Sequence, residues 1–131
     1  MRYMLDTDIF SYLVNGAPQV LERYAVAAEQ EVGISVVSHG EILFGIAKQQ
    51  PSVSKQKRIS YLLDQMSIAL IDEDVARCYG KVRNALESSG KPIGSNDTWI
   101  AAHAMSLGAT LVTGNVREYE RVAGLKIENW I

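Results

Sequence analysis

Residues 1–8 read MRYMLDTD, and this stretch decides how the rest of the chain is interpreted. A short apolar run over residues 3–5 stops at the acid Asp6. Such a run, bounded by polar residues, is typical of a strand buried on both faces in a parallel sheet. Ligands of open α/β sheets bind beyond the carboxyl ends of such strands, so Asp6 lies where chemistry is expected.

A purely structural interpretation of the same residues also stays open. Thr7 or Asp8 can be the N-cap of a helix, because a short polar side chain can accept a hydrogen bond from the first free backbone N–H groups. Asp6 would then be a solvated acid in a loop. On these residues alone the two interpretations are about equally good.

Length, charge and cysteine content limit what the chain can be. With 131 residues it can form one domain that buries roughly two thirds of its unfolded surface. A net charge of -2 excludes a general polyanion binder, so any nucleic-acid contact must come from local patches. Cys78 is the single cysteine, and neither a signal peptide nor a membrane-spanning apolar run is evident, which favours a reducing cytoplasm.

Apolar periodicity predicts alternating strands and helices. Helical spacing and capping residues predict helices over residues 9–14, 18–30, 38–48, 51–66, 72–88 and 95–107. Short apolar or β-branched runs predict strands over residues 3–5, 32–37, 68–71 and 110–113, with a possible edge strand over 125–127. This alternation indicates an α/β fold with a parallel sheet covered on both faces.

Two further acids fall near predicted helix starts. Glu41 lies in the expected first turn after the second strand, and Asp97 lies in the first turn of the helix over 95–107. Helix N-termini favour negative charge, so they keep a carboxylate ionised and able to bind a cation. Asp6, Glu41 and Asp97 can therefore meet at one edge of the sheet.

Each of these two acids also has an ordinary explanation. Ser38 and Glu41 have the spacing of a capping box, in which the glutamate bonds back to the backbone of the serine. Asp97 can be a capping or first-turn acid. Capping does not explain the small and apolar residues around Asp97, such as Gly94 and Ala101, which indicate close packing on the sheet.

Several blocks occur together in a characteristic order. They are MLDTD at 4–8, EILFG at 41–45, KPIGSNDTWIAAHA at 91–104, LVTGN at 111–115, REY at 117–119 and ENW at 128–130. Together they resemble the PIN-domain ribonucleases, and within these the VapC-type toxins of type II toxin–antitoxin systems. The resemblance covers nearly the whole chain and implies a single PIN-like domain over residues 1–131. The implied architecture is a three-layer α/β/α fold with a central parallel sheet of about four to five strands.

The resemblance also implies which residues form the site. Asp6, Glu41 and Asp97 match the acids that hold divalent metal and carry catalysis in PIN domains. Asn115 stands where the family often has aspartate, and its neutral carbonyl oxygen would be a weaker ligand. Asp8 stands where asparagine is commoner, and we interpret it as a helix cap. Thr113 can either hydrogen-bond a ligand or simply end its strand, and we favour the former.

The implied chemistry suits these residue types. Three neighbouring carboxylates repel one another, and a cation relieves that repulsion. Oxygen ligands suit Mg²⁺, or alternatively Mn²⁺, better than zinc. We therefore expect a Mg²⁺-dependent endoribonuclease in which a metal-activated water attacks a phosphodiester in line, leaving a 5′ phosphate and a 3′ hydroxyl.

The resemblance implies partners as well. We expect a VapB-type antitoxin, a structured RNA substrate with tRNA first, operator DNA bound only through the antitoxin, a homodimer, and no membrane. Arg117 and Arg121 follow Asn115 closely and are candidates for RNA phosphate contacts, although solvated surface residues would look the same. His103 and Trp99 are more simply explained by packing than by ligation or base stacking.

Two other functional classes remain open. The Asp6–Asp8 spacing also resembles the start of haloacid-dehalogenase-like phosphatases, with Asp6 as nucleophile, but the following Ile9 and Phe10 fit that family badly. A non-catalytic PIN-like binding module within a repressor complex is the other alternative. The presence of acids at all three core positions argues against it.

Overall fold

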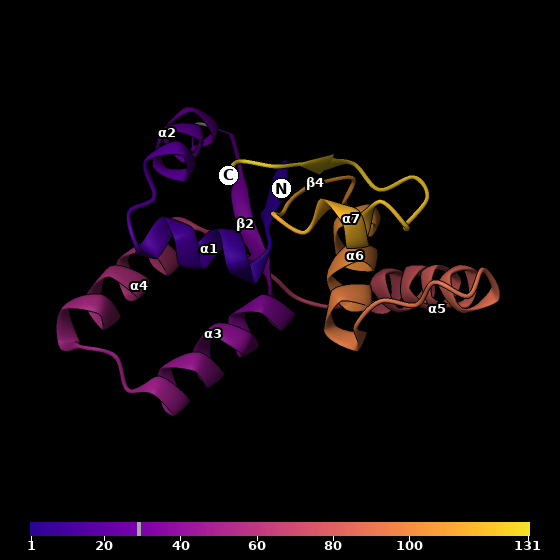
Figure 1. Ribbon diagram of the computed structural model, residues 1–131, viewed down its shortest axis with the longest axis horizontal. Coiled ribbons are helices and arrows are strands. Elements are labelled where there is room, and N and C mark those ends of the chain that lie inside the picture. The colour runs from indigo at the N-terminus through magenta and orange to yellow at the C-terminus, as the bar shows by residue number, and fades with distance from the viewer. Residues whose placement is uncertain (29) are drawn as a thin grey trace.

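A five-stranded parallel sheet lies at the centre of the computed structural model, which describes residues 1–28 and 30–131 (Figure 1). The strand order is β3-β2-β1-β4-β5. The strands are β1 (Tyr3–Leu5), β2 (Val32–Ser35), β3 (Ser67–Ala69), β4 (Thr110–Val112) and β5 (Ile127–Glu128). Leu5 pairs with Val112 across β1 and β4, so these two strands end side by side.

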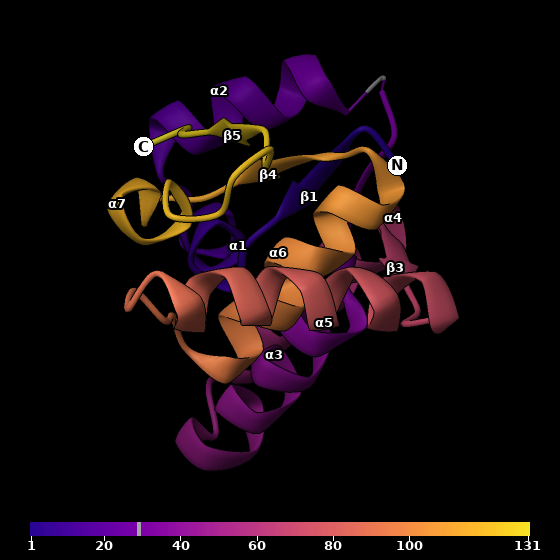
Figure 2. The same ribbon diagram turned by 90° about the vertical axis from the view of Figure 1, so that its right-hand side faces the viewer.

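Helices cover both faces of this sheet (Figures 1 and 2). They are α1 (Thr7–Val14), α2 (Pro18–Ala27), α3 (Val36–Gln49), α4 (Val53–Gln65), α5 (Glu73–Ser88), α6 (Ser95–Leu107) and α7 (Val116–Tyr119). None of these described helices combines the length and the apolar composition needed to cross a membrane.

The alternation of side chains along β1 creates the two cores. Leu5 packs with α1, α2 and α4 through residues such as Phe10, Val20 and Ile59. Met4 faces the other way and packs with α5 and α6 through residues such as Leu86 and Ile100. Successive strand residues point to opposite faces, so one short buried strand supplies both cores. The predicted three-layer α/β fold is confirmed.

Most predicted elements are present with shifted ends. The second predicted strand stops at Ser35 instead of residue 37, and β3 covers residues 67–69 instead of 68–71. Helix α2 ends at Ala27, with Ala28 as its C-cap, and does not reach residue 30 as predicted; residue 29 of the predicted range lies outside the described residues. The short helix α7 was not predicted.

Two helix starts differ from prediction because another side chain caps them. Asp6, not Thr7 or Asp8, is the N-cap of α1, and Asp8 is an exposed first-turn residue. Ser35 caps α3 by accepting a hydrogen bond from the N–H of Val37 at 3.1 Å. The predicted capping box is therefore wrong: Ser38 is buried within α3, and Glu41 lies one turn further along.

Candidate functional site

Asp6 occupies the carboxyl end of β1 and is almost completely buried, with 6% of its surface exposed. One carboxylate oxygen accepts a hydrogen bond from the N–H of Thr7 at 2.8 Å, and the other accepts one from the hydroxyl of Thr113 at 3.0 Å. Burial nevertheless raises the pKa of Asp6 to about 6, and the nearby charges of Asp8 and Glu41 add to this. The fold thus fixes a carboxylate where its charge is poorly solvated.

Thr113 is fully buried just beyond β4. Its hydroxyl donates to Asp6 and also accepts a hydrogen bond from the N–H of Asn115 at 3.0 Å. Thr113 therefore does more than end its strand, because it joins the ends of β1 and β4 through their side chains.

Asp97 lies in the first turn of α6, as predicted, and it is not a cap. The N-cap is Gly94, whose carbonyl accepts hydrogen bonds from both the N–H and the hydroxyl of Thr98. Burial raises the pKa of Asp97 to about 6, and the charges of Glu118 and, more weakly, Asp6 raise it further. Asp6 is therefore close enough to Asp97 for its charge to affect the ionisation of Asp97.

Glu41 reaches the same edge of the sheet from α3. Its carboxylate accepts a hydrogen bond from the hydroxyl of Thr7 at 2.7 Å, and its charge raises the pKa of Asp6. Asp6 thus lies near both Glu41, which comes from α3, and Asp97, which comes from α6. Within the described residues, however, no three acid, histidine or cysteine side chains stand close enough to enclose an ion as they are.

Glu118, on α7, is an acid of this edge that sequence reasoning missed. One of its oxygens accepts a hydrogen bond from the N–H of Gly94 at 3.2 Å, and the other accepts one from the side-chain amide of Asn115. Glu118 lies beside Asp97, and its negative charge helps to raise the pKa of Asp97. A four-residue helix is too short for apolar periodicity to reveal it, so only the position shortly after β4 could have indicated this acid.

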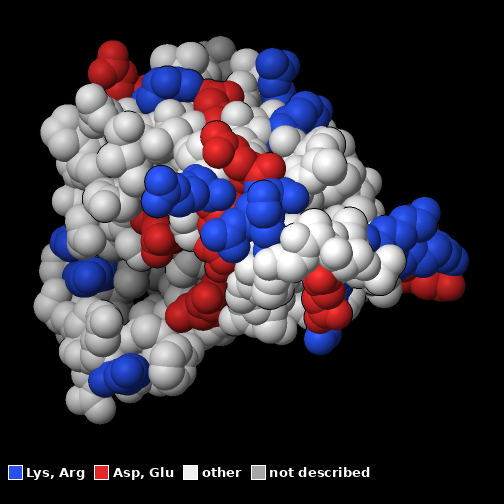
Figure 3. Space-filling model, turned by 45° about the vertical axis from the view of Figure 1, so that its right-hand side comes forward, with Lys and Arg blue, Asp and Glu red and all other residues white. Residues whose placement is uncertain are grey.

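The predicted arginines lie on the surface near α7. Arg117 is exposed, and Arg121 donates a hydrogen bond to the carbonyl of Pro92 at 3.1 Å. Together with Lys91 they line an open hollow of about 840 Å³. Figure 3 shows one face of the molecule on which basic side chains flank a group of acidic ones.

Other residues considered from sequence have structural surroundings. His103 is fully buried, with Nδ1 at 2.8 Å from the hydroxyl oxygen of Ser35, and burial lowers its pKa. Trp99 stacks on Tyr79 with ring centres 3.8 Å apart. These contacts favour packing over metal ligation for His103 and over base stacking for Trp99.

The chemistry of the gathered acids favours a cation. The ion pairs among the described residues involve none of Asp6, Glu41, Asp97 or Glu118. Two of these carboxyls have a raised pKa, which means that their charged forms lack compensation. Carboxylate oxygens are the ligands preferred by Mg²⁺ and Mn²⁺, so the residues present fit such an ion.

Comparisons with known proteins agree across the chain. The PIN domain family model matches residues 3–125. The ribonuclease VapC1 of Haemophilus influenzae strain R2866 is 35% identical, over 99% of this chain and 98% of its own. The tRNA(fMet)-specific endonuclease VapC of Shigella flexneri is 34% identical, with the same coverage. The crystal structure of VapBC2 from Rickettsia felis, bound to a promoter DNA fragment, superposes with a TM-score of 0.93 at 32% identity and covers 100% of both chains.

Proposed function

The chain belongs to the PIN-domain family, and we propose that it is a Mg²⁺-dependent endoribonuclease, the toxin of a VapBC-type toxin–antitoxin pair. In this proposal residues 1–131 act as a single PIN-like domain. The observation that carries the proposal is the proximity of Asp6 and Asp97. They come from separate elements at the carboxyl edge of the sheet, each has a pKa raised to about 6, and the charge of Asp6 contributes to the raised pKa of Asp97.

A divalent cation would complete this arrangement, and PIN-domain ribonucleases are generally dependent on one. Asp6, Glu41 and Asp97 would hold the ion, with Asn115 as a weaker neutral ligand and Glu118 as a further source of negative charge. Mg²⁺ is the expected ion and Mn²⁺ a substitute. When bound, it would supply Lewis acidity that lowers the pKa of a water and neutralises charge developing on the phosphodiester.

The remaining residues of the edge would orient these acids and the substrate. The N–H of Thr7 and the hydroxyl of Thr113 fix both oxygens of Asp6, while the hydroxyl of Thr7 fixes Glu41. Such hydrogen bonds restrict rotation of the ligands before any ion binds. Arg117 and Arg121 would bind RNA phosphates beside the acids and so offset their repulsion of the substrate.

The names of the relatives suggest the substrate and the partner. We take structured RNA, and tRNA first, as the substrate, because the Shigella flexneri relative is named a tRNA(fMet)-specific endonuclease. A VapB-type antitoxin would be the inhibitory partner and would provide the contact with operator DNA, as the DNA-bound VapBC2 complex suggests. The toxin would act as a homodimer in the cytoplasm, where tRNA is available.

Cleavage of purified tRNA tests this proposal. The wild-type protein should cut tRNA with Mg²⁺ or Mn²⁺ and should stop in EDTA, leaving 5′ phosphate and 3′ hydroxyl ends. Asp97→Asn should be inactive, whereas Asp74→Asn should match the wild type because Asp74 is an exposed first-turn acid of α5. Absence of cleavage of tRNA and of total cellular RNA under all these conditions would contradict the nuclease and favour a non-catalytic binding module.

No observation favours the phosphatase hypothesis. Both oxygens of Asp6 accept hydrogen bonds from the chain itself, and Asp8 is exposed on the first turn of α1. Capture of a stable aspartyl-phosphate analogue on Asp6 with beryllofluoride would revive it.

A further inference from the structure

Tyr119 is the last residue of α7 and is fully buried. It packs among the apolar residues of the second core, which include Met4, Ile100 and Leu111. Its hydroxyl lies close to the carboxylate of Asp97, and the charges of Asp6 and Glu118 also act on it. Apolar packing thus fixes the ring, and the position of the ring fixes where the hydroxyl lies.

The hydroxyl of Tyr119 forms no hydrogen bond of standard geometry within the described residues. Buried hydroxyl groups nearly always have a partner, so an unpaired one calls for an explanation. A phenolic hydroxyl keeps its proton at neutral pH. It can therefore only donate to an ionised carboxylate, and its proximity lowers the pKa of Asp97.

We propose that Tyr119 is a positioning residue whose buried hydroxyl donates a hydrogen bond to the Asp97 carboxylate and orients it toward Asp6 for a divalent cation. This inference rests on the proposed function, because it takes Asp97 as a metal ligand. The Tyr119 hydroxyl would thus hold a metal ligand by a hydrogen bond without contacting the ion itself, as the hydroxyl of Thr113 holds Asp6. Outer partners that orient metal ligands commonly contribute about 10- to 100-fold to metal affinity.

The Tyr119→Phe variant separates this role from packing. Phenylalanine keeps the ring and removes only the hydroxyl, so the core around Met4 and Leu111 should stay filled. In EDTA the unfolding temperature should therefore stay close to that of the wild type, since the apolar packing of the ring is kept. Tyr3→Phe is the matched control, because the Tyr3 ring packs on Trp130 at the opposite end of β1 from Asp6.

Binding of Mn²⁺ to the RNA-free protein, followed by the electron paramagnetic resonance signal of free Mn²⁺, tests the proposal. We expect Tyr119→Phe to bind Mn²⁺ about tenfold more weakly than the wild type, and Tyr3→Phe to bind it equally well. Equal affinity in Tyr119→Phe, or a loss of affinity together with a marked loss of unfolding temperature in EDTA, would overturn this inference alone. A wild-type protein that binds no Mn²⁺ would overturn the proposed metal site as well.

Discussion

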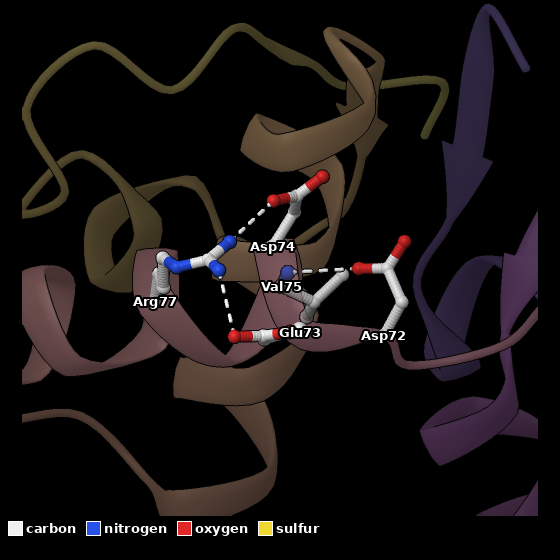
Figure 4. Close-up of polar contacts among 5 residues, drawn as sticks. All are labelled: Asp72, Glu73, Asp74, Val75 and Arg77. Atoms are coloured by element: carbon white, nitrogen blue, oxygen red, sulfur yellow. Dashed lines mark hydrogen bonds and ion pairs between the residues drawn. The ribbon is translucent and has the colours of Figure 1, made fainter.

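Helices α5 and α6 both carry acids in their first turns, but these acids have very different partners. At the start of α5, Asp72 caps the N–H of Val75 at 3.0 Å, and Arg77 pairs with both Glu73 and Asp74 at 2.7 Å (Figure 4). At the start of α6, the cap is a glycine without a side chain. Asp97 there faces two further acids, Glu118 and Asp6.

This difference shows that a cluster of acids at a helix N-terminus does not make a site. Glu73 and Asp74 of α5 are exposed and paired with a cation of their own chain, so they gain nothing from a metal. Asp6 is buried and Asp97 partly so, and each has a pKa raised to about 6. Carboxylates whose charge is uncompensated are the ones to which a bound divalent ion would contribute most.

The largest expected contrast is in catalysis. Asp97→Asn keeps the shape of the side chain but removes its charge, so it should lower Mg²⁺-dependent tRNA cleavage by at least about 100-fold. Asp74→Asn makes the same chemical change at the start of α5 and should leave the rate unchanged. Initial rates of tRNA cleavage at saturating Mg²⁺ measure the effect of each variant. Similar rates for Asp97→Asn and Asp74→Asn would mean that the acid of α6 has no special role in catalysis.

The next contrast is in the pH dependence of stability. A pKa raised from 3.8 to about 6 means that native Asp6 binds its proton more tightly than unfolded Asp6. The resulting stabilisation is fully present below pH 4 and is lost as the pH rises through 6. In EDTA the free energy of unfolding should fall by about 3 kcal/mol over this window through Asp6, with a smaller contribution from the partly exposed Asp97.

Urea unfolding at successive pH values measures this effect. Asp6→Asn should flatten the curve, whereas Asp74→Asn should leave its slope intact. Saturating Mg²⁺ should also remove the fall, because the ion compensates the ionised carboxylates. A metal-free wild-type protein that becomes more stable between pH 4 and 6 would contradict the assigned environment of Asp6.

Removal of a single acid should affect stability in opposite directions at the two regions. Asp6→Asn should raise the metal-free free energy of unfolding at pH 8 by about 2 kcal/mol, because it removes a buried charge and keeps an oxygen that can cap α1. Asp72→Ala should lower it by about 1 kcal/mol, because α5 loses its cap. Denaturant titrations of both variants in EDTA would show this, and a shared sign would refute the comparison.

The smallest expected effect concerns the ion pairs of α5. Arg77→Ala should lower stability by less than about 1 kcal/mol and should not change cleavage, because exposed pairs are screened by solvent. Thermal unfolding with and without 1 M salt should show that even this difference shrinks with ionic strength. A larger, salt-insensitive loss would mean that this region contributes more to the fold than its exposure indicates.

Sequence reasoning worked for the first strand, whereas the role of Asp6 depended on the fold. The apolar run before Asp6 predicted a short buried strand, and the pairing of β1 with β4 placed the acid at the carboxyl edge of the sheet. It failed where two serines competed for one helix start. Ser35 caps α3 because β2 ends there, and nothing local to Ser38 or Glu41 could reveal that.

The features of the site that the sequence did not indicate all depend on tertiary contacts. Glu118 and Tyr119 lie on a helix of four residues, which carries no readable periodicity. The hydrogen bond between Asp6 and Thr113 joins residues 107 positions apart. Burial and neighbouring charge decide the pKa values of Asp6 and Asp97, and both arise only when the strands pair.

Anomalous scattering from a crystal of the protein soaked in Mn²⁺ would show whether Asp6 and Asp97 share a bound ion. We expect an ion bound by oxygens of Asp6 and Asp97 at the carboxyl edge of the sheet, and no ion at Glu73 and Asp74. An empty acidic edge under conditions in which the same protein cleaves tRNA would contradict this expectation, as would an ion bound only at the start of α5.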